Sequence, residues 1–332
     1  MKPHLFQRTL AVVLGATLLS AAPVPPQPDT VRAAGTNATS HLLNAPARAR
    51  VAETFLELVR IPGVSGEEQA IGRALSTRLA ALGATNLPLR VVGSNTPANL
   101  ALILPASHGM ESKPGILLNA HIDTIAVSTP QHLVFDPASG EFSHAHESDP
   151  SLPSSFGGDD RSGVAVVVAA LEHLHEHHWD KGVPHRKFVI LFTAQEERRL
   201  GGARYLARHQ PDLFEGLEIS LCIDGPLNLQ TDYPRERLVA VVPKALEGTQ
   251  PYRRVLEHLD AFCIKAEIQS RRTEIGLGSG DFAAFPANAK AQLHLRSPVR
   301  GWHTRERVQI QDLVHHTAFL TSLLLELDSR NP

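Results

Sequence analysis

The stretch Leu117-Leu118-Asn119-Ala120-His121-Ile122-Asp123-Thr124 is an apolar run that ends in a histidine and a carboxylate two positions apart. Pro114-Gly115 precede it, and an apolar segment bounded by turn residues is typical of a buried strand. Side chains at positions i and i+2 lie on one face of a strand, so His121 and Asp123 should point the same way at its carboxyl end. Open α/β sheets bind their ligands at that end. Taken alone, the pair is more often an ordinary histidine and aspartate, so its meaning depends on partners elsewhere in the chain.

The composition limits the classes of function. The chain has 332 residues, 42% of them hydrophobic, which is enough for one large α/β domain or two small ones. Its 32 Lys and Arg nearly balance its 34 Asp and Glu, and no basic block indicates nucleic-acid binding. Cys222 and Cys263 are the only cysteines, so the chain is not a disulfide scaffold, although one bridge between them is possible.

The first 22 residues have the pattern of a signal peptide. Lys2 and Arg8 give a positive start, 10–19 is an apolar run, and small residues follow at 20–22. An uncleaved membrane anchor is the alternative, but the run is shorter than the about 20 apolar residues that a span needs. Residues 23–45 are rich in Pro, Ala and Thr and are predicted to form a linker. We therefore expect an exported protein, periplasmic or secreted, without a stable membrane anchor.

Strands alternate with helices along the remainder, 46–330. The hydrophobic periodicity predicts helices over 51–59, 164–174, 201–208, 251–262 and 310–327, and strands over 87–92, 99–104, 115–120, 189–193, 219–223, 238–242 and 290–295. Ser65-Gly66-Glu67-Glu68 has the form of a capping box, which would start a further helix that ends near Gly83. The pattern predicts a single catalytic domain with a three-layer α/β/α sandwich around a mixed, mostly parallel sheet.

Two histidine-rich segments need separate interpretations. The polar segment 128–155 contains His144, His146 and Glu147, which could bind metal, but a mobile, solvated lid is the simpler interpretation. His173-Leu174-His175-Glu176-His177-His178 lacks the second histidine of an H-E-x-x-H motif, because Trp179 stands at that position. We interpret that second segment as the polar end of a helix.

Five potential metal ligands follow strands or lie at junctions between strands and helices. They are His121, Asp159, Glu197, Asp224 and, in a late loop expected over 297–304, His303. Two imidazoles and three carboxylates suit zinc. If one carboxylate bridges, each of two zinc ions has three protein ligands and an open position, an arrangement suited to hydrolysis. Asp160 could replace Asp159, and His294 could replace His303, although His294 lies within a predicted strand.

Two further carboxylates have roles beside the metal. Glu196 is adjacent to Glu197, and a carboxylate that does not bind metal can take a proton from water and pass it to the leaving amine. Asp123 can accept the second N–H of a metal-bound His121 and orient its ring. We therefore predict Glu196 and Asp123 as catalytic residues.

The order of these motifs resembles that of the co-catalytic zinc exopeptidases. The order is H-x-D, then G-G-D-D-x-x-G-V, then Q-E-E-x-x-x-G-G-A, then D-G, then a late histidine. That superfamily includes peptidase T, carboxypeptidase G, the secreted bacterial leucyl aminopeptidases and the glutamyl-aminopeptidase branch. The resemblance implies two zinc ions, or zinc plus another divalent metal, bound by the five ligands with Asp159 as the bridge, and Glu196 as the general base. The segments 278–281 and 297–304 are similar to the aminopeptidase branch.

The chain departs from many of these relatives in one respect. Asp224 and His303 are 79 positions apart, and His121 and Asp159 are 38 apart, which leaves too little chain for an inserted lid or dimerisation domain. We therefore expect a monomer. The predicted function is that of an exported aminopeptidase acting on a peptide or amino-acid amide. A carboxypeptidase or N-acyl-amino-acid amidohydrolase is the alternative, and from another class a non-catalytic relative that binds metal or peptide.

Overall fold

The computed structural model describes residues 42–83, 85–87, 98–126, 129–146, 149, 154–228, 236–242, 249–250, 252–273, 280–285, 292–301 and 303–329. The predicted signal peptide and nearly all of the predicted linker lie outside these residues. Within the described part, no helix has both the length and the apolar composition that a membrane crossing requires.

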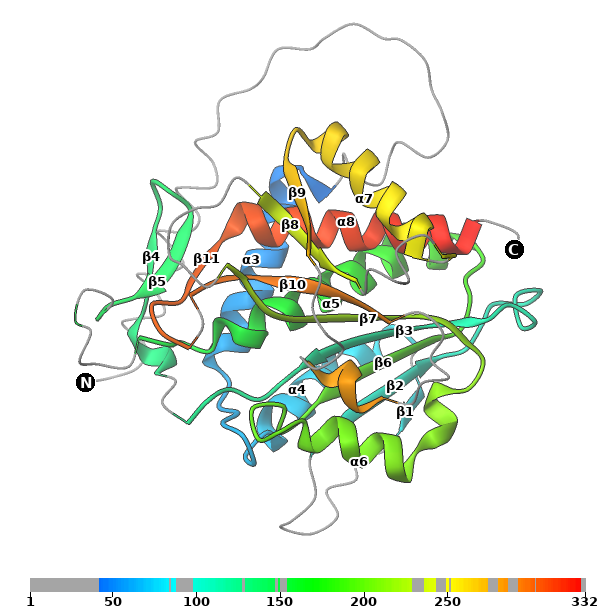
Figure 1. The fold of residues 1–332 in the computed structure, drawn as a ribbon, viewed down its shortest axis with the longest axis horizontal. Coiled ribbons are helices and arrows are strands. Elements are labelled where there is room, and N and C mark those ends of the chain that lie inside the picture. The colour runs from blue at the N-terminus through cyan, green and yellow to red at the C-terminus, as the bar shows by residue number, and fades with distance from the viewer. Residues whose placement is uncertain are drawn as a thin grey trace, which may run out of the picture.

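One mixed sheet organises the described residues (Figure 1). Its strands follow the order β1-β2-β6-β3-β7-β10-β11-β5-β4, and β8 pairs with β10 and with β9. The four central strands, β6-β3-β7-β10, are parallel, whereas the outer pairs are antiparallel apart from β8 with β9. The strands are β1 Thr85–Leu87, β2 Leu100–Leu104, β3 Gly115–His121, β4 Leu133–Asp136, β5 Glu141–His144, β6 Phe188–Thr193, β7 Leu217–Asn228, β8 Glu236–Val241, β9 Gln269–Thr273, β10 Gln292–Arg300 and β11 Arg307–Gln309.

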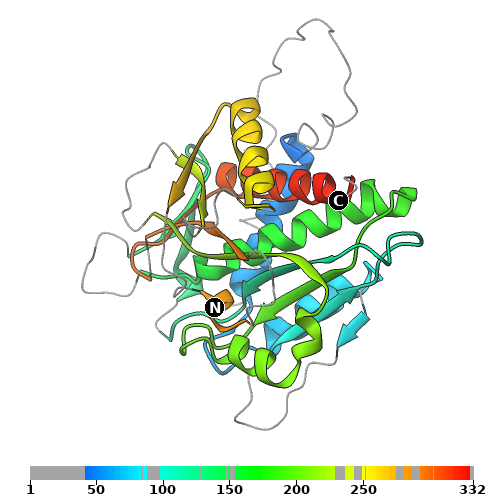
Figure 2. The same cartoon turned by 45° about the vertical axis from the view of Figure 1, so that its right-hand side comes forward.

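Helices cover both faces of this sheet. The first face carries α3 (Ala45–Arg60), α4 (Gln69–Ala80), α5 (Gly158–His177), α7 (Tyr252–Ala266) and α8 (Ile310–Ser329). The second face carries α6 (Gly201–His209) with the short 3₁₀ helices η3 (Pro211–Phe214) and η5 (Asp281–Ala284). Figure 2 shows α5 and α8 on one side of the central strands and α6 on the other. The predicted three-layer α/β/α fold is confirmed.

Strand alternation decides which side chains reach the second face. In β3, Ile116, Leu118 and Ala120 belong to the larger apolar cluster on the side of α5 and α8. Leu117 belongs to the smaller cluster on the side of α6, and His121 has the same parity as Leu117. Because side chains alternate along a strand, the apolar residues of β3 fix the direction of His121.

The predicted capping box is wrong. The hydroxyl of Ser65 donates to Oδ2 of Asp123, so it does not cap a helix. Oε1 of Glu68 accepts the N–H groups of Gly66 at 2.6 Å and of Gln195 at 3.1 Å, and α4 begins only at Gln69. The S-x-x-E pattern is that of a capping box. Ser65 instead bonds to Asp123, and Glu68 bonds to Gln195, both distant in the sequence.

The long loop predicted over 128–155 contains a hairpin instead. β4 and β5 pair with each other, and β5 pairs with β11, so these strands extend the sheet beyond β10. Each strand has only four residues and lies among polar residues. The alternation of buried and exposed side chains along them therefore does not appear as a hydrophobicity pattern in the sequence. Glu147 and the expected strand after Leu87 lie outside the described residues.

Two strands are longer than predicted. β7 continues to Asn228, so Asp224 lies inside a strand rather than at its end. β10 continues to Arg300, where a loop was expected from Ser297 onward. The register between β7 and β10 shifts between Leu295 and Ser297, and such an irregularity allows a proline, here Pro298, within a strand. Cys222 and Cys263 are both buried free thiols, so the possible bridge does not form.

Candidate metal centre

His121 occupies the last position of β3 and is almost fully buried. Its Nδ1 lies 3.1 Å from the backbone oxygen of Asp123, and because a carbonyl only accepts, Nδ1 carries the proton. Nε2 therefore faces Asp159 and Asp224, with Oδ1 of each at 3.5 Å, and is the ring nitrogen available to a cation. Burial alone would lower the pKa of His121, but its carboxylate neighbours raise the pKa well above its ordinary value.

The five predicted ligands form two overlapping groups. His121, Asp159 and Asp224 bring one ligand atom each to within 4.8 Å of one another, and so do Asp159, Glu197 and His303. In the second group, Nε2 of His303 lies 2.6 Å from Oε1 of Glu197 and 3.7 Å from Oδ2 of Asp159. Asp159 belongs to both groups and turns one carboxylate oxygen toward each.

This donor set fits two divalent cations better than it fits an apo cluster. Oδ1 of Asp159 is buried and has no hydrogen-bond partner among the described residues. Burial raises the pKa of Glu196 to about 10 and also raises the pKa of Glu197, with further carboxylates adding to both shifts. Concentrated buried carboxylates of this kind are normally paired with cations, which favour the ionised forms.

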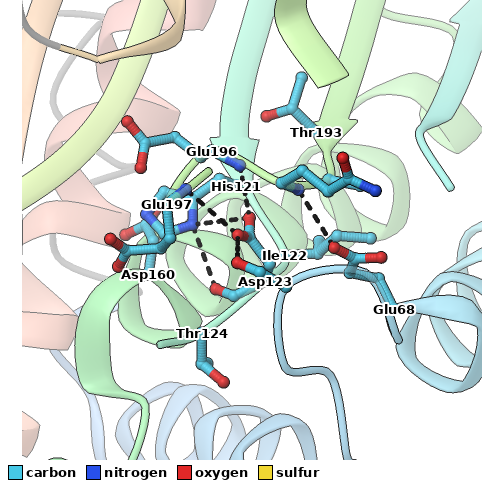
Figure 3. A network of polar contacts seen from close by, with 12 residues as sticks. Glu68, His121, Ile122, Asp123, Thr124, Asp160, Thr193, Glu196 and Glu197 are labelled. Carbon is cyan, nitrogen blue, oxygen red and sulfur yellow. Dashed lines mark hydrogen bonds and ion pairs between the residues drawn. The ribbon is translucent and has the colours of Figure 1, made fainter. Parts of the chain in front are cut away.

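Asp123 connects His121 to the turn that carries the two glutamates (Figure 3). Its Oδ1 accepts the N–H of Glu196 at 2.9 Å, and its Oδ2 accepts the N–H of Glu197 at 3.2 Å. Burial would raise the pKa of Asp123, but the contact with His121 lowers it below the ordinary value, which keeps the carboxylate ionised. Asp123 thus orients the ring of His121 and fixes the turn at the same time.

Consecutive residues of a strand face opposite sides, so the two glutamates can serve one site only where β6 has ended. β6 ends at Thr193, and Gln195 has a positive φ of 55°, which turns the chain. A third group, His121 with Glu196 and Glu197, also brings its ligand atoms within 4.8 Å. Figure 3 shows the side chain of Glu196 extending away from Asp123.

Asp160 and His294 were the alternative ligands, and both make other contacts. Oδ1 of Asp160 accepts the N–H of Gly163 at 3.1 Å and the hydroxyl of Ser297. Nε2 of His294 donates to the backbone oxygen of Asp224 at 2.6 Å. Neither residue joins the three groups of possible ligands found among the described residues.

Sequence reasoning missed Glu306, a fully buried carboxylate three positions after His303. Its Oε2 accepts the N–H groups of Phe156 and Gly157 at 3.0 Å and of Gly158 at 2.8 Å. These residues form the turn that leads directly into Asp159. Glu306 therefore joins the loop of His303 to the loop of Asp159, and the only sequence signal for this role is its closeness to His303.

Asp281 was also missed as a support beneath the site. Its Oδ2 accepts the hydroxyl of Thr193 and lies 3.3 Å from Nδ2 of Asn119. Burial raises the pKa of Asp281 to about 7. The preceding glycine lets this segment approach Asp224, because a Cβ on Gly280 would lie 2.5 Å from Oδ2 of that residue.

As far as the structure describes them, the two other histidine-rich segments do not join the centre. His144 accepts the N–H of His146 through Nδ1 at 3.1 Å, and its Nε2 lies 2.6 Å from the hydroxyl of Thr129. Both ring nitrogens of His144 are therefore engaged. The segment His173–His178 is the end of α5, as predicted, since α5 ends at His177.

A family model matches half of the chain, residues 151–319, and describes the M42 glutamyl aminopeptidases. The chain belongs to the M42 glutamyl aminopeptidase family. This membership places it among the metallopeptidases and confirms the superfamily that the motif order indicated. The match includes Asp159, Glu197, Asp224 and His303 and begins after His121.

Similar proteins and structures extend the comparison for this M42 protein. A probable carboxypeptidase of Emericella nidulans is 36% identical over 170 residues, which cover 49% of this chain and 35% of that protein. Aminopeptidase PepT of Bacillus cereus superposes with a TM-score of 0.62 at 15% identity, covering 86% of this chain and 99% of that one. The TET1 peptidase of Pyrococcus horikoshii superposes with a TM-score of 0.55 at 20% identity, covering 82% and 99%. At 15% and 20% identity, the likeness of these two structures to this chain is a likeness of fold.

Proposed function

We propose that the chain is a metal-dependent exopeptidase that hydrolyses the peptide bond next to a free terminus at a site for two divalent cations. The observation that supports this most directly is the pair of overlapping donor groups that share Asp159. His121 and Asp224 complete the first group, and Glu197 and His303 complete the second. Two imidazoles and three carboxylates are the ligands that zinc accepts, so zinc, or zinc with another divalent ion, is the expected metal.

Glu196 is the proposed general base. Cations held by these residues would polarise the scissile carbonyl and lower the pKa of a water molecule. Glu196 lies beside the ligands, and the N–H of its backbone is held by Asp123. Its carboxylate would take the proton from the attacking water and deliver it to the leaving nitrogen. Asp123 keeps the proton on Nδ1 of His121, so that Nε2 remains available for the metal.

An aminopeptidase is the activity that we favour, because the matched family is described by that activity and PepT of Bacillus cereus is an aminopeptidase. A carboxypeptidase is the second candidate, since the Emericella relative is a probable carboxypeptidase. N-acyl-amino-acid amidohydrolysis would use the same donors. We also propose export to the periplasm or outside the cell, supported by the basic and apolar pattern of residues 1–22.

Conservative substitutions at the two adjacent glutamates test the proposal. Glu196→Gln should retain both metal ions and lower kcat by roughly 10²–10⁴, the scale of general acid–base catalysis, with a smaller change in KM. Glu197→Gln should lower the affinity for one ion, and its activity should partly return at high zinc. Glu215→Gln is the matched control, because Glu215 is exposed on the loop before β7.

Metal content and turnover should be measured on aminoacyl, C-terminal and N-acyl substrates. A metal-loaded wild-type protein that hydrolyses none of them would favour the non-catalytic relative. Full activity of Glu196→Gln would contradict the role of Glu196. Loss of metal from Glu196→Gln, with both ions kept by Glu197→Gln, would reverse the two roles.

A further inference from the structure

The histidine-rich end of α5 contains a pair of histidines that the candidate metal centre does not use. His173 and His177 are four positions apart, which is the spacing of the two histidines in an H-E-x-x-H motif. Residues four apart lie one above the other on the same face of a helix. The two rings are arranged in this way, with centroids 4.4 Å apart and planes inclined at 48°. The pair can therefore offer two imidazole nitrogens to a single ion.

Both histidines border a cavity of about 180 Å³ between three helices. The helices α3, α5 and α8 pack against one another on the first face of the sheet (Figure 1). The polar residues that line the cavity are His173, Glu176 and His177 of α5, Arg50 of α3 and Thr317 of α8. One water molecule occupies about 30 Å³ in the liquid, so the cavity has room for an ion with water molecules around it.

The side chain of His173 is free to bind a ligand from this cavity. The residue is 5% exposed, and its ring nitrogens make no hydrogen bond or ion pair with any residue that the structure describes. They are not sealed in the core either, so a ligand can reach them from the cavity. Other buried histidines have protein partners, such as His316, whose ring nitrogens contact the backbone oxygens of Asp312 and Arg296. His173 is a buried polar side chain directed into a cavity instead.

The charges around the pair suit a cation. Burial lowers the pKa of His173 to about 4, so its ring is neutral near pH 7 and keeps the lone pair that a metal ion needs. Oε2 of Glu176 lies 3.7 Å from Nε2 of His177 and accepts a hydrogen bond from Nη1 of Arg50. The carboxylate of Glu176 therefore offsets the positive charge of Arg50 next to the two imidazoles.

We infer that His173 and His177 bind a divalent transition-metal ion at a site separate from the candidate metal centre. Imidazole is a ligand for zinc, copper and nickel, whereas magnesium and calcium prefer oxygen ligands. Along α5 the pair lies about 20 Å from Asp159, at 1.5 Å per residue, so the ion has no contact with a substrate at the centre. It bridges the last turns of α5 and stabilises that end of the helix. With two protein ligands it binds more weakly than ions at the centre and is lost on dialysis, so it adds nothing to the ions that dialysed protein holds.

The experiment adds zinc to protein whose tight sites are already filled. Wild-type protein is loaded with zinc, dialysed and titrated with Zn²⁺ by calorimetry, and equilibrium dialysis counts the ions bound. The titration should show one further ion per chain beyond those that survive dialysis. A large excess of Mg²⁺ should not displace this ion, because imidazole is a poor ligand for magnesium. Binding is measured without turnover, so the result does not depend on the peptidase activity.

Single substitutions identify the ligands of the further ion. His173→Gln and His177→Gln should each weaken its binding by at least about tenfold, since even residues that only support a metal ligand contribute 10- to 100-fold. Both variants should keep the ions that survive dialysis. The side chain of His177 is 48% exposed, so His177→Gln remains a test if His173→Gln does not fold. His175→Gln is the matched control, because Nε2 of His175 contacts the backbone oxygen of Ala81 at 3.1 Å and Nδ1 lies 3.0 Å from Asp180.

Three results would overturn the inference. The first is a wild type that binds no zinc beyond the ions that survive dialysis. The second is a further ion that binds equally well to His177→Gln, or that His175→Gln weakens as much, which would assign the ion to other histidines. The third is displacement of the further ion by Mg²⁺, which would assign it to carboxylates.

Discussion

Removing the carboxylate of Glu306 should destabilise the protein and empty both metal sites together. In Glu306→Ala, the N–H groups of Phe156 and Gly158 lose their acceptor, Oε2, whereas the N–H of Gly157 keeps the hydroxyl of Ser155 at 3.2 Å. A buried N–H without an acceptor costs about 1–3 kcal/mol, so two cost roughly 4 kcal/mol.

Part of this loss is offset because burying the carboxylate is itself unfavourable. Burial raises the pKa of Glu306 to about 7, above the ordinary 4.5, and this difference corresponds to roughly 3 kcal/mol against the ionised form. The net loss of unfolding free energy should therefore be about 1 kcal/mol. Typical domains have about 5–15 kcal/mol, so the variant should still fold.

The effect on metal binding follows from the position of Asp159. The turn held by Glu306 leads into Asp159, and Asp159 belongs to both donor groups. Loosening this turn should weaken both sites in parallel, whereas Glu197→Gln should weaken one. Glu306→Gln retains an acceptor oxygen without the charge and should give an intermediate result.

Urea unfolding at pH 8, where Glu306 is ionised, measures the free energy of unfolding of each variant. Metal analysis after dialysis measures how many ions each variant holds. Glu215→Gln serves as the control. An alanine variant that unfolds at the wild-type urea concentration and still holds two ions would show that Glu306 supports neither the turn nor the site.

Three further predictions concern metal, pH and assembly. Metal analysis should find two divalent ions that chelation removes in two steps, with loss of activity; one ion or none at saturating zinc would contradict the shared bridge. Burial lowers the pKa of His173 to about 4, so the folded form binds its proton less readily than the unfolded form. Stability should therefore fall by up to about 3 kcal/mol as the pH drops from about 6.5 to about 4, and His173→Gln should fall less in thermal melts. The chain should sediment as a monomer, although the TET1 peptidase that shares its fold can assemble into a tetrahedron or an octahedral shell; a stable dimer at micromolar concentration would refute this.

Much of the centre could be predicted because strand periodicity and motif order are local properties of a sequence. The parity of His121 relative to Leu117 follows from alternation alone, and the structure places His121 on the face that alternation requires. Chain order was also sufficient to group Asp224 and Glu197 with His121, although these residues are far apart in the sequence. The neighbouring strands of one parallel sheet bring them to the same place.

The supports of the centre could not be predicted, since their partners are distant. Glu68 was assigned to a helix cap because its local spacing allows that, but its carboxylate accepts the N–H of Gln195, which is 127 positions away. Glu306 reaches residues about 150 positions earlier. A carboxylate satisfied by backbone N–H groups has no spacing rule, so no pattern in the sequence distinguishes it from a solvated one.

The two donor groups differ in rigidity, and this difference has a structural cause. His121 and Asp224 lie within strands of the central sheet, where each side chain is less than a tenth exposed. Glu197 and His303 lie on turns, with His303 at a positive φ of 59°, and their side chains are 13% and 23% exposed. Fixed, buried donors hold a cation more tightly than donors on a turn, which must also be ordered when the cation binds. The cation at His121 and Asp224 should therefore be the tighter one, and the cation at Glu197 and His303 should be released first. Glu306 should matter to both, because it joins the loop of His303 to the turn before Asp159, the one residue that the two groups share.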